Sequence, residues 1–385
     1  MSNVVLFKEI ESPSNKKIGV VTLNSEKSLN SLSLEMVNLL MPQLLAWQAD
    51  SSIAMVMLEG AGEKAFCAGG DVVQLYKSTV AAGKGNYSPE VETFFAKEYE
   101  LDHLIHTYTK PILLWGHGIV MGGGLGLLAG ASHRVVTEKS RIAMPEITIG
   151  LYPDVGGSYF LNKMPAGCGL FLGLTGASIN ATDAKFVNLA DHFVSSEHKS
   201  QLIEQLLLTD WQDSGEVSQY KQTSNHQKLS DLLAALELKK EQEQSLMPAA
   251  NLARFTSFLA ELEQCKTVQT SVTKITEHQV DDKWFNKAQS SLTHGCALSA
   301  HIIFRQLSLG KTLSIAESFR LELGLSVQCA AIGEFAEGVR ALLIDKDNNP
   351  NWHFKTLNDV SETTLDKIFT SPWPNNQHPL ANLGK

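Results

Sequence analysis

Two carboxylates stand eight residues apart in a run that is otherwise mostly apolar and rich in glycine. The run is RIAMPEITIGLYPDVGG, and its acids are Glu146 and Asp154, each beside a proline. A carboxylate buried among apolar residues has a raised pKa and can serve as a nucleophile or a general base. The structural alternative makes Glu146 an acid in the first turn of a helix and Asp154 a helix N-cap.

Two glycine clusters could supply backbone N–H donors to the same chemistry. In KAFCAGGDVVQLY the backbone can approach a ligand closely, with the N–H of Gly70 free to donate. In MGGGLG, Gly122 to Gly124 stand where an apolar helix is expected to begin, and its first N–H groups lack internal partners. Two such loops suggest an oxyanion hole that stabilises negative charge on a carbonyl oxygen. A tight turn and close helix–strand packing are the structural alternatives.

Other nucleophiles and cofactor loops find little support. The sequence has no G-x-S-x-G elbow and no G-x-G-x-x-G loop, and Cys67 has no histidine close by in the sequence. Carboxylates therefore remain the main candidates for catalysis.

The elements that must position these residues follow a repeated order of strand, loop and helix. Strands are expected over 4–10, 17–24, 53–62 and 111–120, with helices over 31–50 and after the second glycine cluster. This order predicts an α/β fold with a parallel sheet. After about residue 195 the sequence shows helical periodicity and little β pattern, so we expect an α/β core over 1–200 and a mostly helical region over 201–385. The last residues, SPWPNNQHPLANLGK, are expected to form a loose tail.

Composition narrows the cellular setting and the partners. The chain has 385 residues, a net charge of −9 and no basic block, so neither nucleic acid nor an anionic membrane surface is an expected partner. Five cysteines without paired spacing argue against disulfides and against a zinc site. The N-terminus shows no signal-peptide core, and no stretch reads as a membrane span. A cytoplasmic protein without a metal or a separate cofactor is expected.

The segments KAFCAGGD, HGIVMGGGLGL and AMPEITIGLYPDVGGSYFL resemble the crotonase (enoyl-CoA hydratase/isomerase) superfamily. The resemblance implies a spiral of ββα turns that binds a coenzyme A thioester between the glycine loops. It implies that Gly70 and Gly123 donate the two oxyanion-hole hydrogen bonds. It also places four residues along the coenzyme A arm, Lys27, Ser28, Ala68 and Asp71.

The chain is more narrowly similar to the 3-hydroxyisobutyryl-CoA hydrolases, through FFAKEYELDHLI and FAEGVRALLIDKDNNPNW. The acyl-end positions of those enzymes fall on Glu98, Gly123, Glu146 and Asp154. This resemblance implies hydrolysis of the 3-hydroxyisobutyryl-CoA thioester, a step of valine breakdown. Glu146 would then be the nucleophile or the general base, and Asp154 would hold the 3-hydroxyl. Homo-oligomers are common in the superfamily.

Hydratases of the superfamily carry a second glutamate at the position of Gly126, so its absence speaks against water addition to a double bond. An enoyl-CoA hydratase or isomerase of the same fold stays open as an alternative. A non-catalytic acyl-CoA-binding protein is a further alternative, against which the retained acids and glycine loops argue.

Overall fold

The computed structural model describes residues 3–212, 224–237, 245–374 and 377–385. These residues pack into two compact units, and each unit is assembled from three separate stretches of chain. Unit 1 contains Met1–Gly69, Leu104–Ile142 and Ile179–Ala250, and unit 2 contains Gly70–His103, Ala143–Ser178 and Asn251–Lys385. The division at residue 200 expected from composition is a different partition of the chain, and it stays a prediction.

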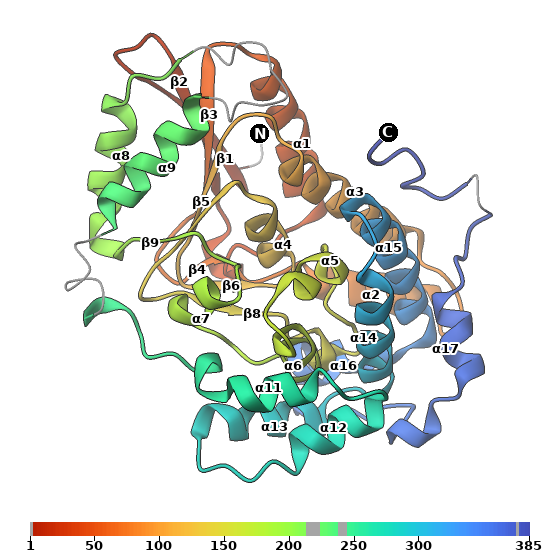
Figure 1. Ribbon diagram of the computed structural model, residues 1–385. Helices are drawn as coiled ribbons and strands as arrows, with labels where there is room; N and C mark the ends of the chain where they lie inside the picture. The colour runs from red at the N-terminus through yellow and green to blue at the C-terminus, as the bar shows by residue number, and fades with distance from the viewer. Residues whose placement is uncertain (1–2, 213–223, 238–244, 375–376) are drawn as a thin grey trace. The chain divides into compact units, whose positions relative to one another are not determined.

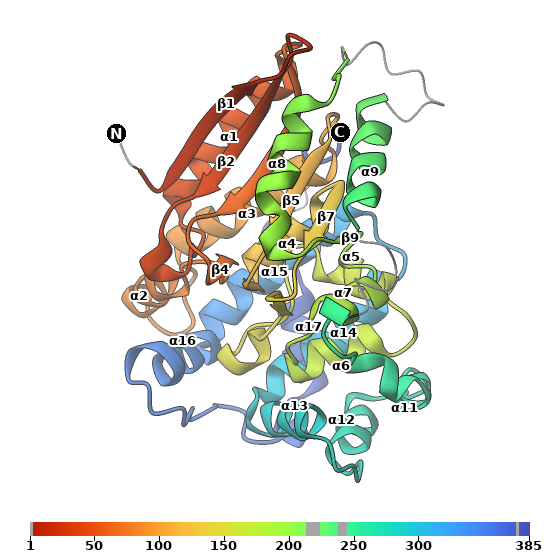
Figure 2. The ribbon, with the colours of Figure 1, turned by 90° about the vertical axis from the view of Figure 1, so that its left-hand side faces the viewer.

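A six-stranded sheet forms the centre of unit 1 (Figures 1 and 2). Its strands, in spatial order, are β1 (Val5–Glu11), β2 (Lys17–Leu23), β3 (Ile53–Gly60), β5 (Ile112–Gly116), β7 (His133–Val136) and β9 (His192–Phe193). The β1–β2 pair is antiparallel and the following pairs are parallel. The predicted α/β class with a parallel sheet is confirmed.

Helices cover both faces of this sheet. On one face lie α8 (Lys199–Leu208) and α9 (Ser224–Leu236) (Figure 2). They bury Leu202, Leu206 and Leu229 against strand residues such as Met55 and Trp115. On the other face, α1 (Leu34–Ala49) brings Trp47 so close to Gly19 that a Cβ there would lie 2.7 Å from the indole ring. Apolar burial on both faces explains why β3 and β5 are almost continuously hydrophobic.

A second, three-stranded sheet contains β4 (Ala65–Cys67), β6 (Ile119–Met121) and β8 (Arg141–Ala143). The prediction of one strand over 111–120 is therefore wrong, because β5 and β6 belong to different sheets. The chain turns between them at Gly118, whose φ is 58°. A Cβ at Gly118 would lie 2.2 Å from the carbonyl oxygen of Lys64, so only glycine fits this turn.

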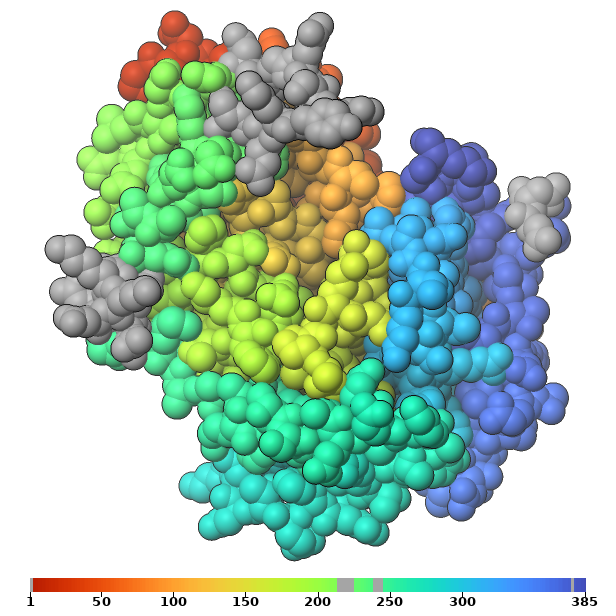
Figure 3. All heavy atoms as spheres, in the orientation of Figure 1, coloured from red at the N-terminus to blue at the C-terminus, as the bar shows by residue number. Residues whose placement is uncertain are grey.

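Unit 2 is built from helices, which include every described regular element after residue 251. Its helices are α2 (Val72–Ala82), most of α3 (Pro89–His106), α5 (Gly157–Phe160), α6 (Cys168–Thr175), α11 (Thr256–Leu262), α12 (Val268–Thr276), α13 (Lys283–His294), α14 (Ala297–Gly310), α15 (Ile315–Ile332), α16 (Glu334–Val339) and α17 (Glu362–Phe369). The segment that contains α11 to α13 forms a continuous surface, green to teal in Figure 3. The prediction of a mostly helical C-terminal half agrees with these described elements.

The expected loose tail is wrong for residues 377–385. Leu380 is buried, His378 contacts the carbonyl oxygen of Arg320, and the Arg320 guanidinium donates to the carbonyl oxygen of Leu383 at 2.9 Å. Among the described residues, none of the helices combines the length and the apolar composition needed to cross a bilayer.

Candidate functional site

Three of the predicted acids meet inside unit 2. Glu98 on α3, Glu146 at the start of the short helix η2 (Glu146–Ile149) and Asp154 in the following loop are 2%, 5% and 4% exposed. Their charges act on one another, because the charge of Asp154 raises the pKa of both glutamates. Gly70 lies beside them, since a Cβ placed there would be 3.9 Å from Oε1 of Glu98. Four predicted site residues therefore share one neighbourhood.

The local backbone at Glu146 is fixed by close packing. Pro145 precedes η2, and Gly150 ends it with a left-handed φ of 69°. A Cβ on Gly150 would lie 2.4 Å from the carbonyl carbon of Glu334, so this glycine allows a close backbone approach. Glu146 is indeed the first residue of a helix, but Oε2 of its side chain finds no hydrogen-bond partner among the described residues. A helix-start role does not account for that buried oxygen.

Asp154 is not the N-cap of the next helix, because Gly156 occupies that position before α5. Between them Val155 has a φ of 48°, a strained value for a β-branched residue. The carboxylate of Glu322 on α15 accepts hydrogen bonds from the N–H groups of Gly156 and Ser158, both at 2.8 Å. These bonds hold the loop in the strained conformation that presents Asp154.

A chain of hydroxyl groups extends from Asp154 into the helices. Oδ2 of Asp154 lies 2.7 Å from the hydroxyl of Tyr99, and that hydroxyl lies 2.8 Å from Oγ of Ser326. The hydroxyl of Tyr152 also lies 2.8 Å from Ser326 Oγ and donates to the carbonyl oxygen of Glu322 at 2.5 Å. Tyr99, Ser326 and Tyr152 are all buried. We call these three residues the hydroxyl relay.

Burial controls the ionisation of the acids. It raises the pKa of Glu98 and of Glu146 well above the usual range for glutamate, and neighbouring carboxylates raise both further. Burial also raises the pKa of Asp154, to about 6, against the lowering effect of a hydrogen bond donated by Tyr99. The pKa of Glu322 is raised by burial to about 8. Such a group of perturbed carboxyls is typical of an active site.

Asp102, on α3 one turn after Glu98, joins Glu98, Glu146, Asp154 and Glu322 as the fifth acid of this buried cluster, and sequence reasoning missed it. Its side chain has no exposed surface, and neither carboxyl oxygen has a hydrogen-bond partner among the described residues. Burial raises its pKa well above the ordinary aspartate value, with further increases from Glu98, Asp154 and Glu322. Asp102 therefore destabilises the folded protein at any pH where an unfolded aspartate is ionised.

Replacing Asp102 by leucine is expected to stabilise the protein at pH 8, by about 1–3 kcal/mol. Because the folded pKa lies above the unfolded one, the cost of Asp102 grows as pH rises above about 4. The part of the gain that comes from ionisation should therefore disappear near pH 4, so the gain should be smaller there, and urea unfolding of both proteins at the two pH values measures it. Equal stabilities at pH 8, or a less stable variant, would show that Asp102 has a partner in the folded protein.

Glu322 and Ser326 were also missed, although helical spacing held a signal for them. On α15 they share one face with Phe319 and Leu323, which are both fully buried. An acid and a serine on an apolar helix face have to find buried partners. Glu98 lies in the charged sequence AKEYELD, where a solvated acid is the usual interpretation, yet Glu98 and the neighbouring Tyr99 are both buried.

The second glycine cluster lies in unit 1, where Gly123 is the first residue of α4 (Gly123–Gly130). Gly122 precedes it with a φ of 49°, and a Cβ at Gly124 would lie 2.4 Å from the carbonyl oxygen of Cys67. Turn geometry therefore explains Gly122, and close packing explains Gly124. Neither explanation covers Gly123, which is the first residue of the helix. Gly126 is buried inside α4 and supplies no acid.

Three of the residues predicted along the coenzyme A arm are neighbours in unit 1. Lys27 and Ser28 are exposed on η1 (Glu26–Ser28), and the N–H of Ala68 donates to the carbonyl oxygen of Leu29 at 3.1 Å. A cavity of about 650 Å³ adjoins this turn; its lining includes Leu29, Lys64, Lys139 and Arg141. Asp71 lies in unit 2, where its carboxylate caps α2 by accepting from the N–H of Gln74 at 3.1 Å.

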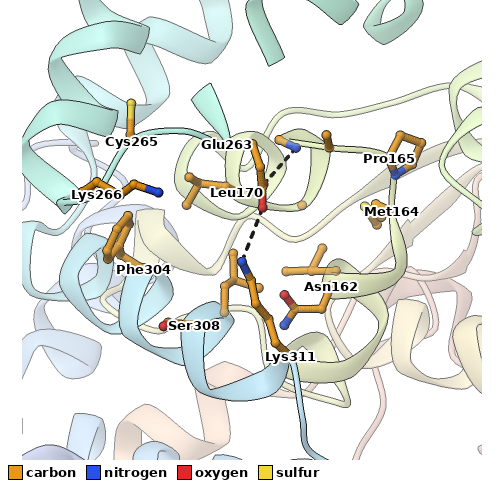
Figure 4. A pocket seen from close by; sticks show the side chains of 15 residues that line it. Asn162, Met164, Pro165, Leu170, Glu263, Cys265, Lys266, Phe304, Ser308 and Lys311 are labelled. Atoms are coloured by element: carbon orange, nitrogen blue, oxygen red, sulfur yellow. Dashed lines mark hydrogen bonds and ion pairs between the residues drawn. The ribbon is translucent and has the colours of Figure 1, made fainter. Parts of the chain in front are cut away.

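Another cavity, of about 410 Å³, opens in unit 2 between the segments around α6, α11 and α14 (Figure 4). Glu263 crosses it, accepting from the N–H of Gly167 at 3.1 Å and from the Lys311 ammonium at 3.4 Å. None of the five buried acids lines this cavity, so it is not part of the candidate site. Within the described part of the chain, no group of three or more His, Cys, Asp or Glu side chains is arranged to hold a metal ion.

Comparison with known proteins places this geometry in a family. Residues 18–369 match the family model described as enoyl-CoA hydratase/isomerase. A mitochondrial 3-hydroxyisobutyryl-CoA hydrolase of Danio rerio is 40% identical over 372 residues, which cover 95% of this chain and 89% of that protein. The Homo sapiens protein of the same name is 35% identical, over 92% of this chain and 86% of the relative.

Solved structures agree with these relatives on the fold. A carnitinyl-CoA dehydratase from Mycobacterium thermoresistibile has a TM-score of 0.83 and 30% identity, with both chains covered completely. An enoyl-CoA hydratase from Rhodobacter sphaeroides has a TM-score of 0.78 and 28% identity, over 96% of this chain and 98% of that one. The predicted crotonase-like fold is confirmed, and the chain belongs to the enoyl-CoA hydratase/isomerase family.

Proposed function

We propose that the protein hydrolyses the thioester of 3-hydroxyisobutyryl-CoA, yielding 3-hydroxyisobutyrate and coenzyme A. The observation that carries this proposal is the buried pair of Glu146 and Asp154 in unit 2, combined with glycine at position 126. The names of the hydrolase relatives, which match nearly the whole chain, support the same substrate.

Glu146 is the reactive carboxylate in this account. As a nucleophile it attacks the thioester carbonyl carbon, the C–S bond breaks, and the thiolate of coenzyme A leaves and takes up a proton. Water then hydrolyses the acyl–Glu146 anhydride, which restores the carboxylate. As a general base, Glu146 instead removes a proton from the water that attacks the carbonyl. Its raised pKa makes the ionised form the better nucleophile and the better base, and hydrolysis requires that ionised form.

Two other acids complete the acyl site. Asp154 accepts a hydrogen bond from the 3-hydroxyl of the substrate and so selects hydroxyacyl groups. Glu98, one helical turn from Asp102, bounds the acyl pocket or holds the water.

The remaining predicted residues serve the thioester oxygen and coenzyme A. We propose that the N–H groups of Gly70 and Gly123 stabilise the negative charge that develops on the carbonyl oxygen. Lys27, Ser28 and Ala68 are proposed to contact the coenzyme A arm. The cationic residues Lys64, Lys139 and Arg141 of the adjoining cavity could hold its phosphates. We propose that Asp71 contributes to coenzyme A binding mainly by capping α2.

A comparison of two thioesters tests the proposed substrate. Purified protein should release thiol from 3-hydroxyisobutyryl-CoA about 10- to 100-fold faster, in kcat/KM, than from isobutyryl-CoA, which lacks only the hydroxyl. The difference corresponds to one buried hydrogen bond, which isobutyryl-CoA cannot make because it lacks the hydroxyl. A thiol reagent measures both rates. Equal rates would remove the proposed role of Asp154, and no release from either ester would refute the hydrolase.

An enoyl-CoA isomerase is the alternative that the site excludes least, because isomerisation needs a single base and Glu146 could be that base. A hydratase would need a second acid where α4 has Gly126. A protein that binds acyl-CoA without reaction is disfavoured by the buried, high-pKa carboxyls.

The setting of the reaction is also a proposal. The relatives from Danio rerio and Homo sapiens are named as mitochondrial proteins. For this chain we propose the cytoplasm and a reaction without metal or separate cofactor. We propose a cytoplasmic enzyme with acyl-CoA as its small-molecule partner, without nucleic-acid or membrane partners. Sedimentation measures whether the chain forms homo-oligomers.

A further inference from the structure

The hydroxyl relay raises the question of which acid of the Glu146–Asp154 pair carries the proton. Both carboxyls are buried, and burial raises the pKa of Asp154 to about 6 and the pKa of Glu146 well above the usual glutamate range, with a further increase from the charge of Asp154. Burial and charge alone would therefore ionise Asp154 first, whereas the hydrogen-bond pattern of the relay argues for the opposite order. Two buried carboxylates with this interaction resist double ionisation, so a single negative charge is shared between them. Hydrolysis by Glu146 requires that charge to reside on Glu146.

The contacts of the relay can be counted against the hydrogens available. Four contacts of 2.5–2.8 Å join Asp154, Tyr99, Ser326, Tyr152 and the carbonyl oxygen of Glu322. The three hydroxyl groups supply three hydrogens, which burial retains because it raises the pKa of Tyr99 and Tyr152 further. With Asp154 ionised, one of the four contacts has no hydrogen and two oxygen lone pairs face each other.

A proton on Asp154 supplies the missing hydrogen. Asp154 then donates to Tyr99, Tyr99 to Ser326, Ser326 to Tyr152, and Tyr152 to the carbonyl oxygen of Glu322. All four contacts become hydrogen bonds with one direction. The second oxygen of Asp154 stays an acceptor, so the neutral acid can still bind a substrate hydroxyl.

We propose that Tyr99, Ser326 and Tyr152 are positioning residues that keep a proton on Asp154 and thereby leave the negative charge of the pair on Glu146. The link to catalysis rests on the proposed function, whereas the site of the proton does not. The titratable groups that act on Asp154 within unit 2 are Glu98, Tyr99 and Asp102 of α3, Glu146 of η2, Tyr152 of its own loop, and Glu322 and Cys329 of α15. All of them are acids, so none offers a positive charge that would favour ionised Asp154.

Two substitutions that shorten the relay test the proposal. When Asp154 is ionised, each variant has two hydrogens for two remaining contacts. In Tyr152→Phe these contacts join Asp154, Tyr99 and Ser326, and in Ser326→Ala they are Tyr99–Asp154 and Tyr152–Glu322 carbonyl. Both changes satisfy the ionised form, so the titration midpoint of Asp154 should fall by about one pH unit, a tenfold change in its protonation equilibrium or about 1.4 kcal/mol. Tyr99→Phe removes the hydroxyl that donates to ionised Asp154, so the midpoint should rise instead.

Infrared difference spectra of the full-length protein between pH 5 and 9 measure this midpoint through the carboxylic C=O stretch. The band is assigned by its loss in Asp154→Asn, and Tyr87→Phe is the matched control. Tyr87 bonds Gln328 in unit 2, outside the relay, so this variant should leave the midpoint unchanged. The readout needs no turnover, so it stays informative even if the protein hydrolyses no thioester.

Opposite shifts in Tyr152→Phe and Tyr99→Phe would support the proposal. A midpoint that is unchanged or raised in both Tyr152→Phe and Ser326→Ala would overturn it. If hydrolysis is established, Tyr152→Phe should also move the ascending limb of its kcat/KM profile to higher pH, because charge returned to Asp154 makes Glu146 harder to ionise. A limb that stays in place would contradict the link to catalysis.

Discussion

Glu146→Gln is expected to abolish thiol release from 3-hydroxyisobutyryl-CoA while the protein stays folded. The amide keeps the size of the side chain but cannot attack a carbonyl or accept a proton from water. A lost general base reduces kcat by about 10²–10⁴-fold, and a lost nucleophile by more. The release of thiol, followed with a thiol reagent at several enzyme concentrations, measures the residual rate.

Folding has to be controlled for in this comparison. Burial raises the pKa of Glu146, so a neutral amide should not lower the free energy of unfolding at neutral pH. Glu100→Gln is a suitable control, because Glu100 is an acid on the same unit that pairs with Lys97 at the surface. That variant should hydrolyse the thioester at the rate of the unmodified protein. Wild-type activity in Glu146→Gln would contradict the assignment of the reactive carboxylate.

Asp154→Ala is expected to remove the preference for hydroxyacyl substrates. The variant loses the acceptor for the 3-hydroxyl, so kcat/KM for 3-hydroxyisobutyryl-CoA should fall by about 10- to 100-fold. The value for isobutyryl-CoA should change much less, because that ester makes no such hydrogen bond. The ratio of the two values, measured with the same enzyme preparation, reports the role of Asp154 independently of the amount of active protein.

Asp154→Asn provides a sharper comparison at the same position. Its amide can donate to Tyr99 and still offer an oxygen to the substrate, so it imitates the protonated aspartic acid. The preference for the hydroxyacyl ester should therefore stay close to that of the unmodified protein and well above that of Asp154→Ala. A loss as large as in Asp154→Ala would mean that the substrate requires an ionised carboxylate at this position.

Much of the site could be predicted from the sequence, because the reactive residues stand in an unusual local setting. Glu146 and Asp154 attract notice through their proline and glycine neighbours, and the structure buries both. The parallel sheet also follows from local hydrophobic runs. Gly118, in contrast, splits an apparently continuous strand, because its environment depends on Lys64, which lies far away in the sequence.

Long-range packing explains what sequence reasoning missed. Glu322 and Ser326 lie about 170 residues beyond Asp154 and bond Gly156 and Tyr152 of its loop only when α15 packs against that loop. Asp102 looks like one more acid in a charged helix, and only its complete burial reveals its effect on stability. The strain at Val155 has no local sequence signal either, because it is imposed by hydrogen bonds to Glu322.

The most direct test of the account offers the purified protein 3-hydroxyisobutyryl-CoA and, separately, crotonyl-CoA. Thiol release and the loss of enoyl absorbance are followed together. The account predicts rapid thiol release from the hydroxyacyl ester, dependent on Glu146, and little consumption of the enoyl ester. Consumption of crotonyl-CoA without thiol release, and no thiol from the hydroxyacyl ester, would show a hydratase and contradict the proposed hydrolysis.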